Sequence, residues 1–179
     1  PIEINGGQME AQLRGFVDRV DRWTNGEIDY FRVVDYKTGK KDFDYCDILN
    51  GLGLQMLIYM FALEDGGFFE KYSTPAGVQY FPARVPLVKA EGSLSEEEAA
   101  AEHRKTFKRN GLILSDEAVL RAMEPSDTPK RLNITRKKDG TVSGDIASAK
   151  QFTVLKKYIF KLLKHLCLLN KRCFYIMTY

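Results

Sequence analysis

Apolar and polar residues alternate over much of the first forty positions, a period of two that is typical of β-strands. The alternation covers 13–23 and 30–37, and the segment between them, 24–29, is rich in turn residues. A shorter alternating stretch, 2–4, precedes an Asn-Gly-Gly turn signal. The pattern predicts a hairpin or a three-stranded meander in this part of the chain.

Further along, the apolar period changes to three and four, which is typical of helices. Over 46–63 polar residues are so few that most of the predicted helix must be buried. A Ser-x-x-Glu capping box predicts a helix over 95–109, ended by Gly111. Shorter and longer helices are expected over 115–123 and from 152 to 169.

Two non-helical segments complete the predicted elements. A short strand is expected over 78–81, where flanking prolines limit its length. An irregular or hairpin segment is expected over 125–144, which contains an Asp-Gly turn signal. With no internal repeat, the chain fits one α/β (α+β) domain with a small sheet and flanking helices.

Composition agrees with a globular domain and excludes several other classes. The 179 residues are 44% hydrophobic and 28% charged, with a net charge of +3, which excludes global disorder. Three cysteines, an odd number, argue against a secreted disulfide framework and favour a cytoplasmic location. No apolar run of about twenty residues is present, so no membrane span is expected.

The charge is unevenly distributed along the chain. Segment 151–179 holds six of the 27 basic residues and none of the 24 acidic ones, so the preceding part is net negative. Such a basic end usually forms a solvated helix face and sometimes binds an anionic partner.

The candidate chemistry lies in the first predicted hairpin. Asp35 and Lys37 are two apart, so they project from one face of a strand, roughly 7 Å from each other. A tight turn or a wider loop within 24–29 both place Asp18 on that same face. A register shifted by one residue would place Asp21 there instead, and the hairpin pattern leaves both aspartates open.

Two neighbouring carboxylates repel each other unless a cation lies between them. Oxygen ligands of this kind suit Mg²⁺ or Mn²⁺, and Lys37 beside the ion would orient a water or stabilise charge in the transition state. The set suggests hydrolysis of phosphodiesters. The alternative is an ordinary surface salt bridge of Asp35 or Asp18 with Lys37 or Arg19.

Three motifs in order decide between these interpretations: GFVDRVD at 15–21, VVDYKTG at 33–39 and QMLIY at 55–59. Together they resemble the nuclease signature of the PD-(D/E)XK superfamily, in its RecB-like branch. The match is closest to the C-terminal nuclease domain of the B subunit of AddAB (RexAB) helicase–nucleases. It continues more loosely through 75–81 and 110–116 to about position 159.

The resemblance implies a restriction-endonuclease-like core and a role for six residues. These are Asp18, Asp35 and the carbonyl of Tyr36 as ligands of Mg²⁺ or Mn²⁺, Lys37 as the catalytic lysine, and Gln55 and Tyr59 beside the site. The resemblance thereby selects Asp18 rather than Asp21 as the metal ligand. For Asp21 and Arg19 it implies only a supporting, structural role. From the helical spacing alone, Gln55 and Tyr59 would be a buried polar pair.

The resemblance also implies the wider function: a metal-dependent DNA exonuclease domain of an ATP-dependent helicase–nuclease that acts in double-strand-break repair and recombination. Its partners would be DNA and the second subunit of that enzyme. The alternative is a non-catalytic nuclease-fold module that scaffolds or grips DNA. Residues 1–179 would form a single domain fragment, with 160–179 a divergent basic helix.

Two departures from the family pattern are expected to matter. Relatives have a helix before the first strand that supplies a further ligand, and this sequence starts too late to include it. Relatives also hold an iron–sulfur cluster through four cysteines. Here Cys167 and Cys173 match the last spacing, but position 164 is lysine and no upstream cysteine serves as the first ligand. We therefore expect no cluster and interpret Cys46, Cys167 and Cys173 as ordinary thiols.

Overall fold

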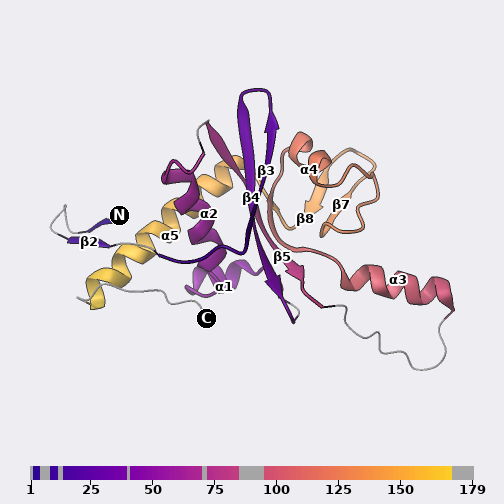
Figure 1. The fold of residues 1–179 in the computed structure, drawn as a ribbon, viewed down its shortest axis with the longest axis horizontal. Helices are drawn as coiled ribbons and strands as arrows, with labels where there is room; N and C mark the ends of the chain where they lie inside the picture. Colours follow the sequence, from indigo (N-terminus) through magenta and orange to yellow (C-terminus); the bar gives the residue numbers. More distant parts are fainter. Residues whose placement is uncertain are drawn as a thin grey trace.

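The fold is built around one mixed β-sheet (Figure 1). The computed structural model describes residues 2–4, 9–11, 14–39, 41–69, 72–84 and 95–170. Five strands lie in the order β3-β4-β5-β6-β9, and neighbours alternate between antiparallel and parallel pairing. They are β3 (Arg19–Asn25), β4 (Ile28–Lys37), β5 (Ser73–Pro82), β6 (Asn110–Leu114) and β9 (Ile146–Ala147).

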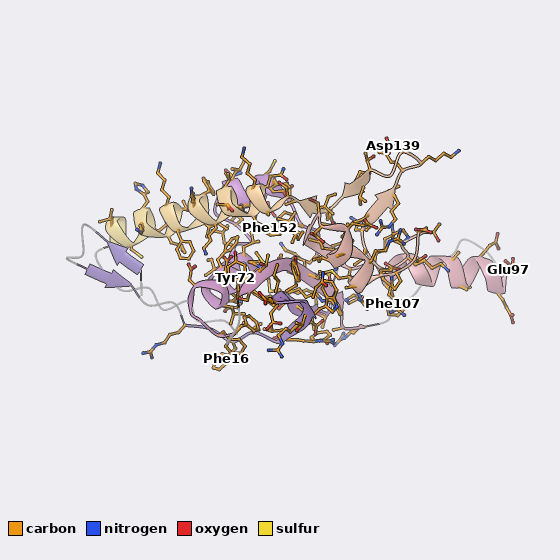
Figure 2. The ribbon with its side chains drawn as sticks, turned by 90° about the horizontal axis from the view of Figure 1, so that it is seen from above. Phe16, Tyr72, Glu97, Phe107, Asp139 and Phe152 are labelled. Atoms are coloured by element: carbon orange, nitrogen blue, oxygen red, sulfur yellow. The ribbon has the colours of Figure 1, made fainter. Side chains whose placement is uncertain are left out.

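Helices cover both faces of this sheet, which confirms the predicted architecture. One face packs against α2 (Gln55–Asp65) and α5 (Ala149–Asn170), with α1 (Tyr45–Leu49) beside them. The other face carries α4 (Glu117–Met123) and the hairpin of β7 (Ile134–Arg136) and β8 (Val142–Gly144). Helix α3 (Glu96–Thr106) extends away from the body in Figures 1 and 2, and β1 (Ile2–Ile4) pairs with β2 (Met9–Ala11) separately.

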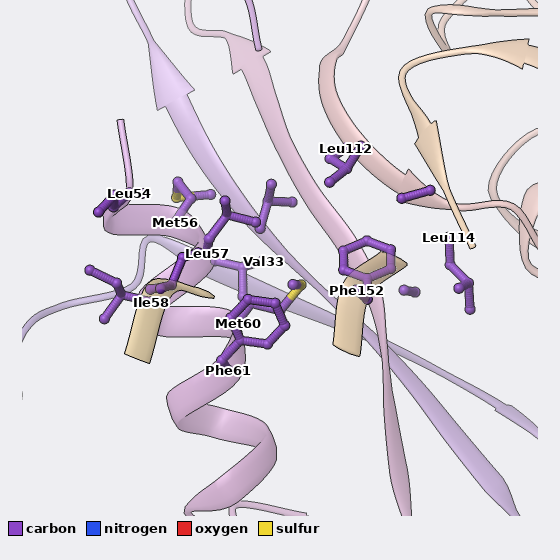
Figure 3. Packing of buried hydrophobic residues seen from close by; sticks show 14 of the residues in the cluster. Val33, Leu54, Met56, Leu57, Ile58, Met60, Phe61, Leu112, Leu114 and Phe152 are labelled. Carbon is purple, nitrogen blue, oxygen red and sulfur yellow. The ribbon is translucent and has the colours of Figure 1, made fainter. Parts of the chain in front are cut away.

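The main core lies between α2, α5 and the central strands (Figure 3). Six consecutive residues of α2, Met56 to Phe61, are buried, as the scarcity of polar residues in this segment predicts. Val33 of β4 and Phe152 of α5 complete the contact. Burial of such side chains contributes about 1.5–3 kcal/mol each, so the strand that carries Asp35 is firmly held on this face.

A smaller core fills the opposite face of the sheet. Ile113 of β6 packs with Leu120 of α4, Leu132 and Ile134, all buried. Strands β5 and β6 are covered on both faces, so their buried positions form continuous runs, whereas the buried and half-buried positions of β4 alternate over most of its length.

Several predicted boundaries need correction. The first strand begins at Arg19 rather than at position 13, because pairing with β4 begins there. The helix predicted over 46–63 is broken into α1 and α2. Gly51 and Gly53 between them have φ of +77° and +64°, a conformation that interrupts a right-handed helix.

Two further predictions, at the start of β5 and at β6, were wrong. Strand β5 ends at Pro82 as expected, but it begins at Ser73 and includes Pro75, which lies where the register shifts between Phe31 and Arg32, so its missing N–H costs little. Gly111 does not end a helix, because Asn110–Leu114 forms a buried strand.

Other predictions were confirmed. Residues 19–37 form a hairpin rather than a meander, since β1 and β2 belong to a separate sheet. The capping box of α3 forms, with the Glu98 N–H donating to Ser95 Oγ at 3.3 Å and the Ser95 N–H donating to Glu98 Oε2 at 2.9 Å.

The turn expected at 5–7 lies outside the described residues. In the described part of the chain no helix is long and apolar enough to cross a membrane.

Candidate active site

The register of the β3–β4 hairpin determines which aspartate faces Asp35. Arg19 pairs with Val34, so Asp18, one residue earlier, lies opposite Asp35. Its carboxylate is fixed there, because Oδ2 accepts a hydrogen bond of 3.1 Å from the backbone N–H of Tyr36. Directly opposed residues share a face of the sheet. The structure therefore brings Asp18, Asp35 and Lys37 to one face, as the first of the two registers predicts.

Asp35 is the more enclosed of the two carboxylates. Its side chain is 17% exposed, and Oδ2 lies 2.6 Å from Lys37 Nζ. The contact is an ion pair that lacks hydrogen-bond geometry. Asp35 Oδ2 is also shielded from solvent. Lys37 ends β4 and is 41% exposed at its side chain, so it reaches both Asp35 and solvent.

These groups fit a divalent cation. Asp35 and Asp18 present two carboxylates across the hairpin, and a cation bound between them would compete with the Lys37 ammonium for Asp35 Oδ2. In the described ranges no set of three or more acidic, His or Cys side chains gathers at one place. One or two carboxylates with backbone and water oxygens suffice for Mg²⁺, so the Tyr36 carbonyl is a suitable further ligand.

Asp21 belongs to the opposite face of the hairpin. It pairs across the strands with Arg32, whose Nη2 lies 2.7 Å from Asp21 Oδ2, and it also forms an ion pair with Arg19. Burial alone would raise the pKa of Asp21, but hydrogen bonds from the two guanidinium groups outweigh it and the pKa is lowered. Asp21 is thus a structural anion, and Arg19 supports it.

We expect Asp21→Asn to lower the free energy of unfolding by about 1–2 kcal/mol at pH 7, since it removes the charge that both arginines bind. A lowered pKa stabilises the fold above the pKa of the unfolded chain, near 4, and this stabilisation is lost as the pH falls through the folded-state value. Urea unfolding at pH 7 and at a series of lower pH values measures the difference, which should shrink as the pH falls through the folded-state pKa of Asp21. A difference of equal size at every pH would contradict this role.

The Gln-x-x-x-Tyr pair lies in the first turns of α2. Gln55 Nε2 donates to the hydroxyl of Tyr59 at 3.2 Å, and Gln55 is exposed whereas Tyr59 is buried. The Tyr59 ring lies directly on Gly15, because a Cβ built there would be 2.2 Å from the Tyr59 hydroxyl oxygen. Through this contact the helix motif touches the segment that leads into Asp18.

The first and third motifs therefore meet in space, while the second carries the carboxylate and the lysine. A family model, the PD-(D/E)XK nuclease superfamily, matches residues 1–164. The chain belongs to this superfamily. It is a nuclease domain whose mixed sheet is consistent with the family's fold, and nucleases of this superfamily generally depend on a divalent metal.

Curated relatives are longer proteins. Those of Acetivibrio thermocellus and Clostridium kluyveri are each 36% identical to the chain, over 172 and 173 residues, and are named as the B subunit of an ATP-dependent helicase/deoxyribonuclease. One of the same name from Bacillus mycoides is 38% identical over 171 residues. The matches cover 93%, 93% and 89% of the chain but 15%, 15% and 14% of the relatives. The chain thus spans about one seventh of their length.

We expect Gly15→Ala in this nuclease domain to cost about 1–3 kcal/mol of stability and to disturb the Gln55–Tyr59 hydrogen bond, because the methyl group would occupy the position of the Tyr59 ring. Gly39→Ala is the matched control, since no atom lies within 4 Å of a Cβ at that position. Thermal unfolding of both variants measures the difference. Equal melting temperatures would show that the Tyr59 contact does not constrain Gly15.

Two polar residues at the site were not singled out in the sequence. Tyr80 pairs with Asp35 across the parallel strands β4 and β5, and burial together with the Asp35 charge raises the pKa of Tyr80 to about 12. Asn110, opposite Tyr80 on β6, donates to Asp42 Oδ1 at 2.7 Å and to the Lys41 carbonyl at 3.0 Å. In the sequence, the looser resemblance to the nuclease family over 75–81 and 110–116 indicates that these two residues could belong to the site.

Proposed function

We propose that the chain hydrolyses phosphodiester bonds of DNA, using Mg²⁺ or Mn²⁺ held by Asp18, Asp35 and the Tyr36 carbonyl. The observation that carries the proposal is the meeting of Asp18 and Asp35 across one hairpin with Lys37 beside them. The family supplies the reaction class, and the relatives' name, deoxyribonuclease, supplies the substrate.

Each of these side chains has a distinct task. A metal held by these residues would supply Lewis-acid chemistry at a phosphate oxygen and would lower the pKa of a water molecule. Asp35 presents an anionic oxygen from a rigid strand, and the Tyr36 N–H orients Asp18. Lys37, whose ammonium lies within 2.6 Å of Asp35, is placed to orient the attacking water and to stabilise negative charge that develops on the phosphate. Gln55 and Tyr59 support the segment that leads into Asp18.

The relatives' name also indicates the setting. We infer that the domain works as an exonuclease within an ATP-dependent helicase–nuclease, beside a partner subunit, in cytoplasmic repair and recombination of broken DNA. Such an enzyme delivers strands to the nuclease site as the duplex is unwound, so a site open to solvent at Asp18 and Lys37 suits a substrate fed from outside.

Degradation of end-labelled single-stranded DNA by the 179-residue chain tests this function. We expect cleavage with Mg²⁺ or Mn²⁺, none in EDTA, and loss of cleavage in Asp35→Ala and Lys37→Ala. Equal cleavage by all three proteins would contradict a catalytic role for Asp35 and Lys37. DNA binding by a folded wild-type chain without cleavage in either metal would favour a non-catalytic DNA-gripping module instead.

A further inference from the structure

A second cluster of charge and aromatic rings lies on the other face of the sheet. The guanidinium groups of Arg19, Arg32 and Arg109 surround the ring of Phe81, at 6.0, 5.5 and 4.1 Å from its centroid. Phe81 follows Tyr80 in β5 and so points away from the Asp35 face. We call these three arginines the arginine cluster; they come from β3, β4 and the residue that precedes β6.

The positive charge of this cluster is only partly compensated. Asp21 forms ion pairs with Arg19 and Arg32. In the part of the chain that the structure describes, no carboxylate forms an ion pair with Arg109. The charge of Glu124 acts on Arg109, but the oxygens of Glu124 accept hydrogen bonds from the backbone N–H groups of residues 130–132. Two of the three arginines thus share one carboxylate, and among the described residues Arg109 has no ion-paired partner.

Burial and neighbouring cations both disfavour the charged form of Arg109. Burial lowers the pKa of Arg109, and repulsion from Arg32 and Arg131 lowers it further. Like charges held together in this way weaken the fold unless an anion is bound. An anionic ligand on this face would relieve the repulsion, and guanidinium groups recognise phosphate well because they can donate two parallel hydrogen bonds.

An exposed aromatic ring completes the surface. Tyr36 is 43% exposed and packs edge-on against Phe81, with centroids 6.0 Å apart and planes at 85°. Arg19 Nη1 donates to the Tyr36 hydroxyl at 3.1 Å and thereby fixes the ring. The Arg19 side chain is itself 47% exposed. Arginines beside an accessible aromatic ring are the combination that binds single-stranded nucleic acid, because phosphates pair with the cations and bases stack on the ring.

The cluster and the candidate active site share one end of the sheet. Tyr36 lies between Asp35 and Lys37 along β4, so its side chain points to one face while their side chains point to the other. Exposed Phe107 and Lys108 lead into Arg109 at the base of α3 (Figure 2). A strand bound here would reach the carboxylates by passing around the end of β4.

We propose that the arginine cluster and Tyr36 bind a single-stranded nucleic acid on the face of the sheet away from Asp35, separately from the metal. This inference rests on the proposed function in one respect only: it takes the bound nucleic-acid strand to be the substrate that is cleaved. It adds a second contact surface, which would hold the strand next to the site without taking part in hydrolysis.

Fluorescence anisotropy with a labelled oligo-dT, in EDTA and over a range of salt concentrations, tests this proposal on the 179-residue chain. We expect Arg109→Gln to weaken binding about tenfold and to lower the salt slope by about 0.7, the value for one lost phosphate contact on a single strand. Tyr36→Leu should weaken binding by about fivefold or more with an unchanged slope, because it removes stacking rather than charge.

Lys138→Gln is the charge-matched control. Lys138 is exposed beside Asp139 at the tip of the β7–β8 hairpin, away from Phe107 in Figure 2, so its loss should change neither affinity nor slope beyond a small uniform effect. Trp23 is the sole tryptophan and stacks on Tyr30, so its emission spectrum reports whether each variant keeps the hairpin.

Binding by Arg109→Gln and Tyr36→Leu that equals binding by Lys138→Gln would overturn the proposal. This failure would be distinct from a failure of the proposed function, which appears as absent cleavage by the wild-type chain in Mg²⁺ or Mn²⁺. If the proposal holds, Arg109→Gln raises the KM for single-stranded DNA in the cleavage assay and leaves kcat within about twofold of the wild-type value.

Discussion

Asp35→Asn should lower the rate of metal-dependent DNA cleavage at least about a thousandfold, which corresponds to roughly 4 kcal/mol of transition-state stabilisation. Asparagine has the shape of aspartate but lacks its charge, so the variant keeps the packing of β4 while one anionic ligand is lost. Single-turnover cleavage of labelled single-stranded DNA measures the rate. A rate within threefold of the wild-type value would exclude Asp35 from the site.

Asp29→Asn provides the matched control for this loss. Asp29 lies on the same strand and the same face as Asp35, and it is buried. Near the hairpin turn it accepts a hydrogen bond of 2.6 Å from the Thr24 hydroxyl and forms an ion pair with Arg22 at 3.6 Å. We expect this variant to be less stable than the wild type and to cleave normally once folded. An equal loss of cleavage in both variants would indicate general damage to the hairpin.

Lys37→Met should lower kcat about 10²–10³-fold while the metal remains bound. The ammonium contacts Asp35, so its removal also relieves the competition between Lys37 and a cation for the same carboxylate. The metal affinity of Lys37→Met should therefore equal or exceed that of the wild type, although its kcat is lower. Loss of a purely structural lysine would not change these two quantities in opposite directions. Cleavage rates measured over a metal titration separate the two effects, and a fall in metal affinity with unchanged kcat would contradict a role in transition-state stabilisation.

Sequence patterns predicted much of the site because it lies within one hairpin. Alternation along 30–37 placed Asp35 and Lys37 on one face, and the turn limited the register to two possibilities. The alternation alone does not decide between Asp18 and Asp21, because a shift of the pairing register by one residue moves every side chain of a strand to the opposite face of the sheet. Only the motif resemblance favoured Asp18. The structure gives a physical reason: Asp21 is engaged by Arg32 on the other face.

Features that depend on tertiary contacts could not be predicted in this way. The helix break at Gly51 and Gly53 interrupts an apolar period that is otherwise continuous, and β6 is too short to differ from a helix end by pattern alone. The arginine cluster is the clearest example, because its residues come from distant parts of the chain that look unrelated until the sheet assembles.

Calorimetric titration of Mn²⁺ into the wild-type chain, Asp18→Asn and Asp21→Asn measures whether Asp18, together with Asp35, holds the metal. We expect saturable binding to the wild type and to Asp21→Asn, and binding to Asp18→Asn that is at least about tenfold weaker. Binding lost in Asp21→Asn but retained in Asp18→Asn, or no difference among the three folded proteins, would contradict this role of Asp18.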